Sequence, residues 1–146
     1  MESLPIEDLA LSGRLGELKV QLQAGYEQKT IDKALGLAIA YAQLAVAEYL
    51  ISLGADITYD KYDGVYYAVH NSQLEGLKFA IAKGVDINVQ NGLLLNTAVM
   101  SATNTGNTDI LTWMLRNGAD TQLISPDMLA VARRFGSEQL KRLLNL

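Results

Sequence analysis

Residues 44–56 read LAVAEYLISLGAD, and this phrase decides the fold because the chain repeats it at near-constant intervals. Related phrases stand at residues 74–86, LEGLKFAIAKGVD, and at residues 108–120, TDILTWMLRNGAD. A shorter and more degenerate copy ends at Ala24 and Gly25. Self-similarity at a period of about 20–50 residues is typical of stacked repeat proteins. Each apolar stretch predicts a helix that ends at its glycine, and a new helix is expected shortly afterwards.

The interval between an alanine and the closing glycine defines one repeat. In the second repeat it runs from Ala38 to Gly54, which is 16 residues, and the third repeat has the same interval. In the fourth repeat it runs from Ala98 to Gly118 and is four residues longer. Because residues 103–108 are polar and include a glycine, we expect the insertion to form a loop there.

The second helices of the repeats align in three apolar columns, which stand seven, five and three residues before the glycine. Such columns place one apolar face on each helix, and stacking the repeats then predicts a continuous core. We therefore expect Phe79 and Trp113 to be core residues. The columns contain Leu18, Ala47, Leu77 and Leu111; then Val20, Tyr49, Phe79 and Trp113; and then Leu22, Ile51, Ile81 and Leu115.

Residues at the expected helix ends carry their own signals. Ser125, Pro126 and the acid that follows them are typical of a helix start, with an N-cap, a proline in the first turn and a negative charge near the positive end of the helix. Thr108 and Ser137 predict similar starts. The closing glycines suit the left-handed residue just beyond a helix C-terminus. They are Gly54, Gly84 and Gly118.

Composition narrows the functional classes. The chain has 146 residues, with 12 basic and 16 acidic side chains and a net charge of −4, so it lacks the basic surface of a nucleic-acid-binding protein. It has no cysteine, which excludes disulfides and cysteine-based zinc sites. Its first residues lack the basic start and apolar run of a signal peptide, and we expect a cytoplasmic protein.

One stretch, residues 35–55, is apolar enough to be mistaken for a membrane span. It contains Gln43, Glu48 and Ser52, and a carboxylate at the centre of a bilayer costs roughly 2.5–3.5 kcal/mol. We therefore interpret this stretch as two shorter helices with a turn near Gln43, and we expect no association with a membrane.

The repeated glycine-alanine-aspartate, with an alanine 16 residues before it, resembles the ankyrin repeat. The consensus of that family opens with threonine-proline-leucine-histidine, a hydrophobic residue and two alanines. Residues 4–10 (LPIEDLA), 63–69 (DGVYYAV) and 127–133 (DMLAVAR) hold this slot here. The resemblance implies a nearly all-α solenoid of stacked helix-turn-helix repeats in a single domain, residues 1–146. The repeats are expected at about residues 4–26, 33–57, 63–87, 92–121 and 126–146.

The chain also departs from the ankyrin pattern. No repeat keeps the opening consensus intact, and the link after each glycine is about three residues shorter than a period of ~33 residues implies. We therefore expect the β-hairpin fingers that such links normally form to be short or degenerate. The fourth repeat also fits a second register, in which residues 97–103 hold the opening slot and the insertion moves into the preceding link. Other helical-hairpin arrays are the structural alternative.

Ankyrin arrays of the kind that this chain resembles usually bind proteins through a concave face, which the first helices and the links form. The link at residues 58–63 places two tyrosines and mixed charge before the third repeat, and tyrosine is enriched in binding hot spots. The alternative interpretation is that the tyrosines fill gaps between repeats and leave their hydroxyls in water. The predicted partner-binding residues are Tyr41, Tyr59, Asp60, Tyr62, Tyr66, His70 and Asn71.

No constellation of residues predicts catalysis. His70 is the single histidine, and it has neither metal-ligand spacing nor a nucleophile nearby in the sequence. The glycines stand at expected helix ends rather than in a phosphate-binding pattern. We therefore predict a non-enzymatic module that binds another protein, without cofactor or metal. The expected state is a monomer or a weak homo-oligomer. The alternative function is a self-associating scaffold that pairs through Phe135 with Leu140 or Leu144, or through the incomplete cap of the first repeat, and an enzyme is a remote third possibility.

Overall fold

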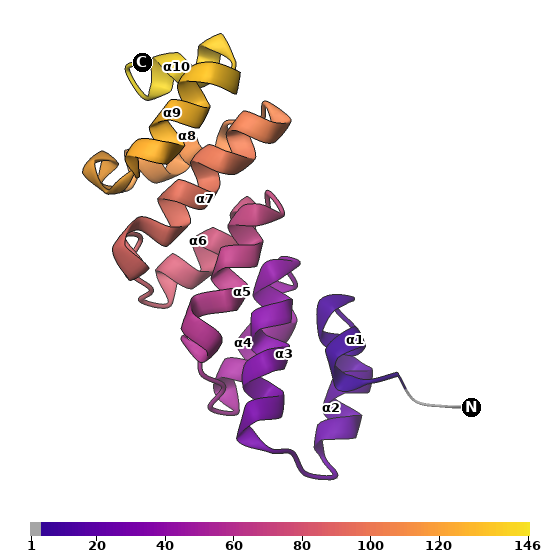
Figure 1. Ribbon diagram of the computed structural model, residues 1–146. Coiled ribbons are helices and arrows are strands. Elements are labelled where there is room, and N and C mark those ends of the chain that lie inside the picture. The colour runs from indigo at the N-terminus through magenta and orange to yellow at the C-terminus, as the bar shows by residue number, and fades with distance from the viewer. Residues whose placement is uncertain (1–3) are drawn as a thin grey trace. The chain divides into compact units, whose positions relative to one another are not determined.

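The computed structural model describes residues 4–146, which fold into five helix pairs without a β-strand (Figure 1). The predicted all-α repeat fold with degenerate fingers is therefore confirmed. The exact limits of the five repeats stay a prediction. The pairs are α1 (Ile6–Leu11) with α2 (Leu15–Leu22), α3 (Gln28–Ala40) with α4 (Leu44–Ser52), α5 (Tyr59–His70) with α6 (Leu74–Ala82), α7 (Val89–Thr105) with α8 (Asp109–Arg116), and α9 (Pro126–Phe135) with α10 (Glu138–Leu143); the 3-10 helix η1 (Thr121–Leu123) precedes the last pair.

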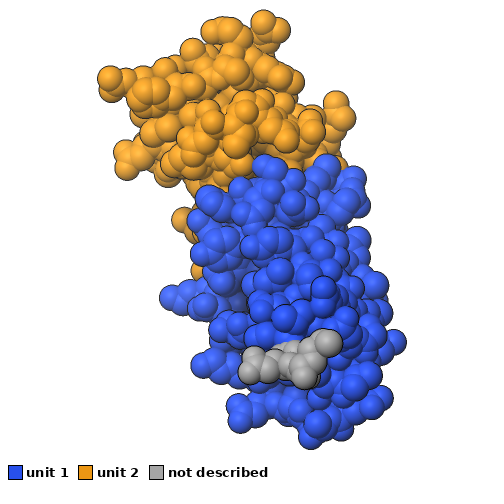
Figure 2. All heavy atoms as spheres, turned by 90° about the vertical axis from the view of Figure 1, so that its right-hand side faces the viewer, with its two compact units in different colours: residues 1–80 blue, residues 81–146 orange. Residues whose placement is uncertain are grey.

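Contacts divide the chain into two compact units, residues 1–80 and residues 81–146, which Figure 2 draws in separate colours. In the first unit α3 lies between α1 and α5, and α4 packs on α3 (Figure 1). In the second unit α7 packs against α8, α9 and η1, while α10 packs on α9. In both units the first helices of neighbouring repeats therefore lie side by side.

A left-handed residue turns the chain between the two helices of a repeat. Ala42, with a φ of 56°, separates α3 from α4, and the N–H of Gln43 donates to the carbonyl of Ala38 at 2.7 Å. This is the turn that we predicted inside the apolar stretch at residues 35–55. Among the described residues, no helix has both the length and the apolar character that crossing a membrane requires.

The predicted helix ends are largely confirmed. Ser125 and Ser137 accept hydrogen bonds from the N–H groups of Met128 and Leu140, both at 3.1 Å. Thr108 does precede α8, but it is buried and its side chain does not cap the helix. The closing glycines are left-handed, as expected, with φ of 93°, 101° and 94° at Gly54, Gly84 and Gly118.

The core differs from the prediction in two of the three columns of the second helices. In the column three residues before the glycine, Leu22 is buried, but Ile51, Ile81 and Leu115 are half-buried. The column seven residues before the glycine is buried, but the column five residues before it is not: Val20 is 66% exposed, and Phe79 and Trp113 are half-buried. Positions two apart in a helix point to different sides, whereas positions three and four apart share a face. The buried partner column therefore stands four residues before the glycine. It contains Leu50, Ala80 and Met114.

The insertion in the fourth repeat lengthens a helix, so the predicted loop at residues 103–108 is wrong for its first half. α7 continues to Thr105 and stops at Gly106, which has a left-handed φ of 77°. The hydroxyls of Thr103 and Thr105 donate to carbonyls one turn earlier, both at 2.8 Å. These bonds satisfy the polar side chains inside the helix, so their polarity does not force a loop.

Two of the links between repeats form a left-handed turn at the position where a short or degenerate β-hairpin finger was expected. Asp60, Lys61 and Tyr62 have φ between 52° and 65°, and Gln90, Asn91 and Gly92 repeat this conformation 30 residues later. A left-handed non-glycine residue costs roughly 1–2 kcal/mol. The repetition of this turn at equivalent positions indicates that the short link imposes it.

Polar side chains join one repeat to the next. The carboxylate of Asp32, only 7% exposed, accepts a hydrogen bond from the N–H of Asp56 at 2.7 Å. In the second compact unit, Asn96 accepts from the N–H of Ser125 and donates to the carbonyl of Leu123, both at 2.9 Å. Each bond satisfies a backbone group in a link, which the helices themselves leave without a partner.

Candidate functional site

A contact between two glycines fixes the distance between α3 and α5. A Cβ atom on Gly64 would lie 2.6 Å from the carbonyl oxygen of Gly36 and 2.9 Å from its carbonyl carbon. In the opposite direction, a Cβ atom on Gly36 would lie 3.5 Å from the Cα atom of Gly64, which is an ordinary contact. The backbone of α5 therefore touches α3 at Gly64, where a larger residue does not fit.

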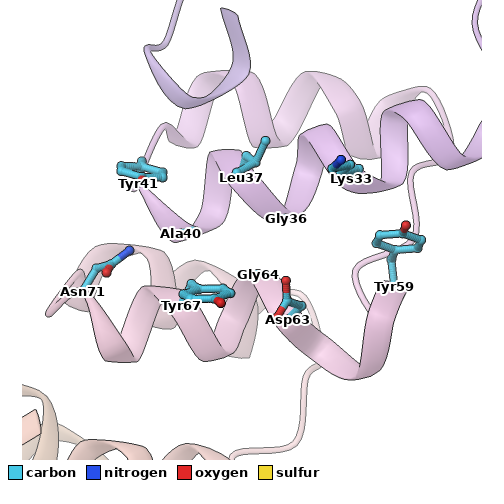
Figure 3. Close-up of a pocket in the computed structure, with 10 residues that line it drawn as sticks. All are labelled: Lys33, Gly36, Leu37, Ala40, Tyr41, Tyr59, Asp63, Gly64, Tyr67 and Asn71. Atoms are coloured by element: carbon cyan, nitrogen blue, oxygen red, sulfur yellow. The ribbon is translucent and has the colours of Figure 1, made fainter. Parts of the chain in front are cut away.

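A pocket of about 210 Å³ opens beside this glycine contact, and both helices line it (Figure 3). Its volume lies below the roughly 300–1,000 Å³ of most small-molecule sites. The pocket lies wholly within the first compact unit. It is lined by Lys33, Gly36, Leu37, Ala40, Tyr41, Tyr59, Asp63, Gly64, Tyr67 and Asn71.

The side chains that line the pocket form two matching stripes. Residues spaced four apart share one face of a helix, and the stripe on α5 repeats the stripe on α3 after 30 residues. The stripes are Lys33, Leu37 and Tyr41 on α3, and Asp63, Tyr67 and Asn71 on α5 (Figure 3). We call these two stripes, together with Tyr59 at the start of α5, the first-helix face.

Aromatic rings gather along the second half of α5. The rings of Tyr66 and Tyr67 meet edge to face with centroids 4.9 Å apart, and Tyr66 stacks on His70 at 5.9 Å. Tyr67 also meets His70 edge to face, at 6.1 Å. Tyr41 and Tyr67 stay open to solvent, 47% and 43% exposed. Tyr67 therefore belongs both to the first-helix face and to an aromatic cluster that includes His70.

Two charged side chains stand on opposite sides of the pocket. Lys33 on α3 forms an ion pair with Glu7 on α1, with 3.0 Å between Nζ and Oε1, and the hydrogen bond and charge of Glu7 raise the pKa of Lys33. The pKa of Asp63 on α5 is also raised, because burial and the nearby charge of Asp60 both disfavour its ionised form. The lysine charge is thus compensated by Glu7, whereas the carboxylate of Asp63 stands where a negative charge is costly.

The structure separates the residues that we predicted as one patch. Tyr41, Tyr59 and Asn71 line the pocket, whereas Tyr66 and His70 belong to the aromatic cluster. The other two predicted residues are outside the lining. They are Asp60 and Tyr62, in the left-handed turn at the start of α5.

Sequence reasoning missed Ala40 and four side chains of the two stripes that line the pocket. The signal that finds them is the four-residue spacing on each first helix, read together with the 30-residue offset between repeats. We looked instead for tyrosines in the link. The missed side chains are Lys33, Leu37, Asp63 and Tyr67.

Residues 65–115 match the family model of ankyrin repeats. This segment is similar to ankyrin repeats. It is also 29% identical, over 96% of its length, to the ankyrin repeat and KH domain-containing protein mask-1 of Caenorhabditis elegans. The chain spans about 6% of the length of that relative. Ankyrin repeats are generally modules of protein–protein interaction and a non-enzymatic type of domain.

The described part of this chain contains no group of three or more acidic, histidine or cysteine residues that is placed to hold a metal ion. The polar groups that line the pocket are those of its tyrosines, its amide and its two charged residues. Such groups recognise a side chain by stacking, hydrogen bonding and charge.

Proposed function

We propose that this chain is a non-enzymatic protein-binding module whose partner docks on the first-helix face of α3 and α5. The observation that carries this proposal is the pair of exposed tyrosines, Tyr41 and Tyr67, on either side of a pocket. The close contact between Gly36 and Gly64 also lines this pocket. Tyrosine contributes a large contact area and loses little rotamer freedom, which favours it at interface hot spots. The preformed pocket lowers the cost of ordering on binding.

The remaining predicted residues border this surface. Tyr66 and His70 support Tyr67 through ring contacts, and Asp60 and Tyr62 lie at the opposite end of α5. We propose Tyr41, Tyr59 and Asn71 as direct partner contacts, as predicted, and we add Tyr67 and Asp63 to them. Tyr66 and His70 then act by holding the ring of Tyr67.

The experiment uses the purified chain as bait in a lysate of its source organism, followed by mass spectrometry and a titration with each recombinant candidate. The test variant is Tyr41→Ser with Tyr67→Ser. The matched control is Tyr26→Ser, because Tyr26 is 44% exposed and lies outside the pocket. We expect a stoichiometric complex that the double variant weakens at least about 100-fold, since a hot spot carries 2 kcal/mol or more. A partner that binds wild type and double variant equally would overturn the proposed face.

Self-association remains the second candidate because Phe135 is 64% exposed. Its predicted companion Leu140 is fully buried and is not available for pairing, which corrects that part of the prediction. Sedimentation equilibrium over a wide concentration range distinguishes the two functions. A self-associating scaffold shows a mass that rises with concentration and falls back to the monomer in Phe135→Ser.

A further inference from the structure

We propose that the pocket between α3 and α5 holds the arginine side chain of a basic segment of the partner protein. This inference rests on the proposed protein-binding function and adds the chemistry of the residue that is recognised. It stands on the size of the pocket, its aromatic lining and its charge.

The size of the pocket fits one long side chain. A volume of about 210 Å³ corresponds to roughly seven waters at ~30 Å³ each. Drug-sized ligands occupy larger clefts. A single inserted side chain fills such a space, while its backbone stays outside on the first-helix face.

The lining of the pocket is aromatic on three sides. Tyr41 comes from the end of α3, Tyr67 from the middle of α5 and Tyr59 from its start (Figure 3). Cations are attracted to the faces of aromatic rings, and arginine stacks on them more often than lysine does. The guanidinium is also weakly hydrated, so it enters a partly apolar pocket more readily than an ammonium group does.

The charge of the pocket favours a cation. Asp63 lines it and Asp60 stands nearby, while the charge of Lys33 is compensated by Glu7 at 3.0 Å. Asp63 is exposed and lines the pocket, so its carboxylate is accessible to an incoming cation. A nearby opposite charge favours the ionised form of a carboxylate. A planar guanidinium can donate two hydrogen bonds to the carboxylate of Asp63 while it stacks on a tyrosine.

Other occupants fit these groups less well. An aliphatic side chain would remove water from the carboxylate of Asp63 without giving it a donor, which is unfavourable. An anion would stand beside Asp63 and Asp60 and would meet a lysine that is already paired. The arginine is the occupant that satisfies both the rings and the carboxylate.

The probe for this proposal is a blocked pentapeptide, glycine-serine-arginine-serine-glycine, titrated into the full chain and followed by NMR. We expect shifts centred on the amides of Gly36 and Gly64 and on the rings of Tyr41 and Tyr67. One inserted side chain predicts a Kd on the order of 1 mM. The same peptide with citrulline, which keeps the shape and removes the charge, should bind at least about tenfold more weakly.

The decisive variant is Asp63→Asn, which keeps the size of the side chain and removes its charge. This variant should bind the arginine peptide at least about tenfold more weakly than the wild type does. The control Asp127→Asn removes an exposed carboxylate from the first turn of α9, outside the pocket, and should leave the affinity unchanged. Circular dichroism of both variants verifies that they fold.

Three results would overturn the arginine assignment: no shifts at roughly 10 mM peptide, shifts centred elsewhere, or tighter binding of a lysine or norleucine peptide. Its failure is distinguishable from failure of the proposed function. If a partner is lost with the Tyr41→Ser, Tyr67→Ser variant but kept with Asp63→Asn, the protein-binding function stands and the arginine inference falls. If the arginine peptide binds in the pocket while no partner needs the two tyrosines, the proposed function falls.

Discussion

Replacing Gly64 by alanine tests whether the backbone contact between α3 and α5 builds the pocket. The added Cβ atom would stand 2.6 Å from the carbonyl oxygen of Gly36, whereas ordinary contacts begin at 3.4 Å. The Cα atom of Gly36 would be closer still, so the two helices would have to separate by about 1 Å at this point. The same change at Gly36 meets the other helix at 3.5 Å and needs no movement. Alanine at Gly64 and alanine at Gly36 are therefore matched substitutions, because both add one methyl group at the same helix contact but only the first meets the other helix too closely.

The two substitutions should change the free energy of unfolding in opposite directions. Alanine stabilises a helix by up to about 1 kcal/mol relative to glycine, and overpacking a well-packed contact costs about 1–3 kcal/mol. Gly64→Ala should therefore lower the free energy of unfolding by about 1–2 kcal/mol, while Gly36→Ala should raise it by about 0.5–1 kcal/mol. At about 2–4 °C per kcal/mol, Tm falls by about 2–8 °C in the first variant and rises by about 1–4 °C in the second.

Thermal and urea unfolding followed by circular dichroism measures both variants against the wild type. The arginine peptide then reports on the pocket, because separating the helices at Gly64 changes the distance between the two stripes. A Gly64→Ala variant that is as stable as Gly36→Ala would refute the argument from the glycine contact. So would a Gly36→Ala variant that loses more stability than Gly64→Ala.

Three further changes test the fold and the site. Leu18→Ala removes a fully buried side chain and should cost about 2–5 kcal/mol in urea unfolding, whereas Val20→Ala, at a position 66% exposed, should cost less than about 0.5 kcal/mol; equal losses would restore the predicted core column. Ser125→Ala removes the hydrogen bond to the N–H of Met128 and should lower the free energy of unfolding by about 1 kcal/mol, while Ser125→Asn, which keeps an acceptor, should not. Asp63→Asn should raise Tm at pH 7, because a carboxyl with a raised pKa in the folded state destabilises the fold when it is ionised. The difference in Tm from wild type should disappear as the pH falls below the ordinary pKa value of 3.8. A variant that is less stable than wild type at pH 7 would contradict the direction of the pKa shift.

Local stereochemistry made part of this structure readable from the sequence. A glycine after each apolar stretch predicted the left-handed residue at Gly54, Gly84 and Gly118, because few other residues adopt that conformation without strain. Serine and proline predicted the start of α9, because a serine side chain accepts an N–H of the first turn and proline suits the first helical position. The recurrence of the glycine-containing phrase predicted a series of helix pairs, and the short links predicted short or degenerate β-hairpin fingers.

Other features of the structure were not readable from the sequence in the same way. Thr103 and Thr105 look like loop residues in the sequence, but hydrogen bonds to their own helix keep them in α7. Val20 belongs to an apolar column and nevertheless faces solvent, because the rotation of each second helix is set by what it packs against. Asp32 is a charged residue with no sequence sign of burial, yet it is buried and its carboxylate accepts the N–H of Asp56 in the link that follows α4.

The candidate site shows the same division. The sequence by itself determined that tyrosines would gather on the first helix of the third repeat and near the end of the preceding one. Only the tertiary structure decided which of them face one pocket, because the approach of Gly64 to Gly36 sets Tyr67 and Asp63 opposite Tyr41 and Lys33. Local residues such as Gly54 and Ser125 indicate where a helix ends or begins. The distance and rotation between helices come from contacts 30 residues apart, which no local pattern specifies.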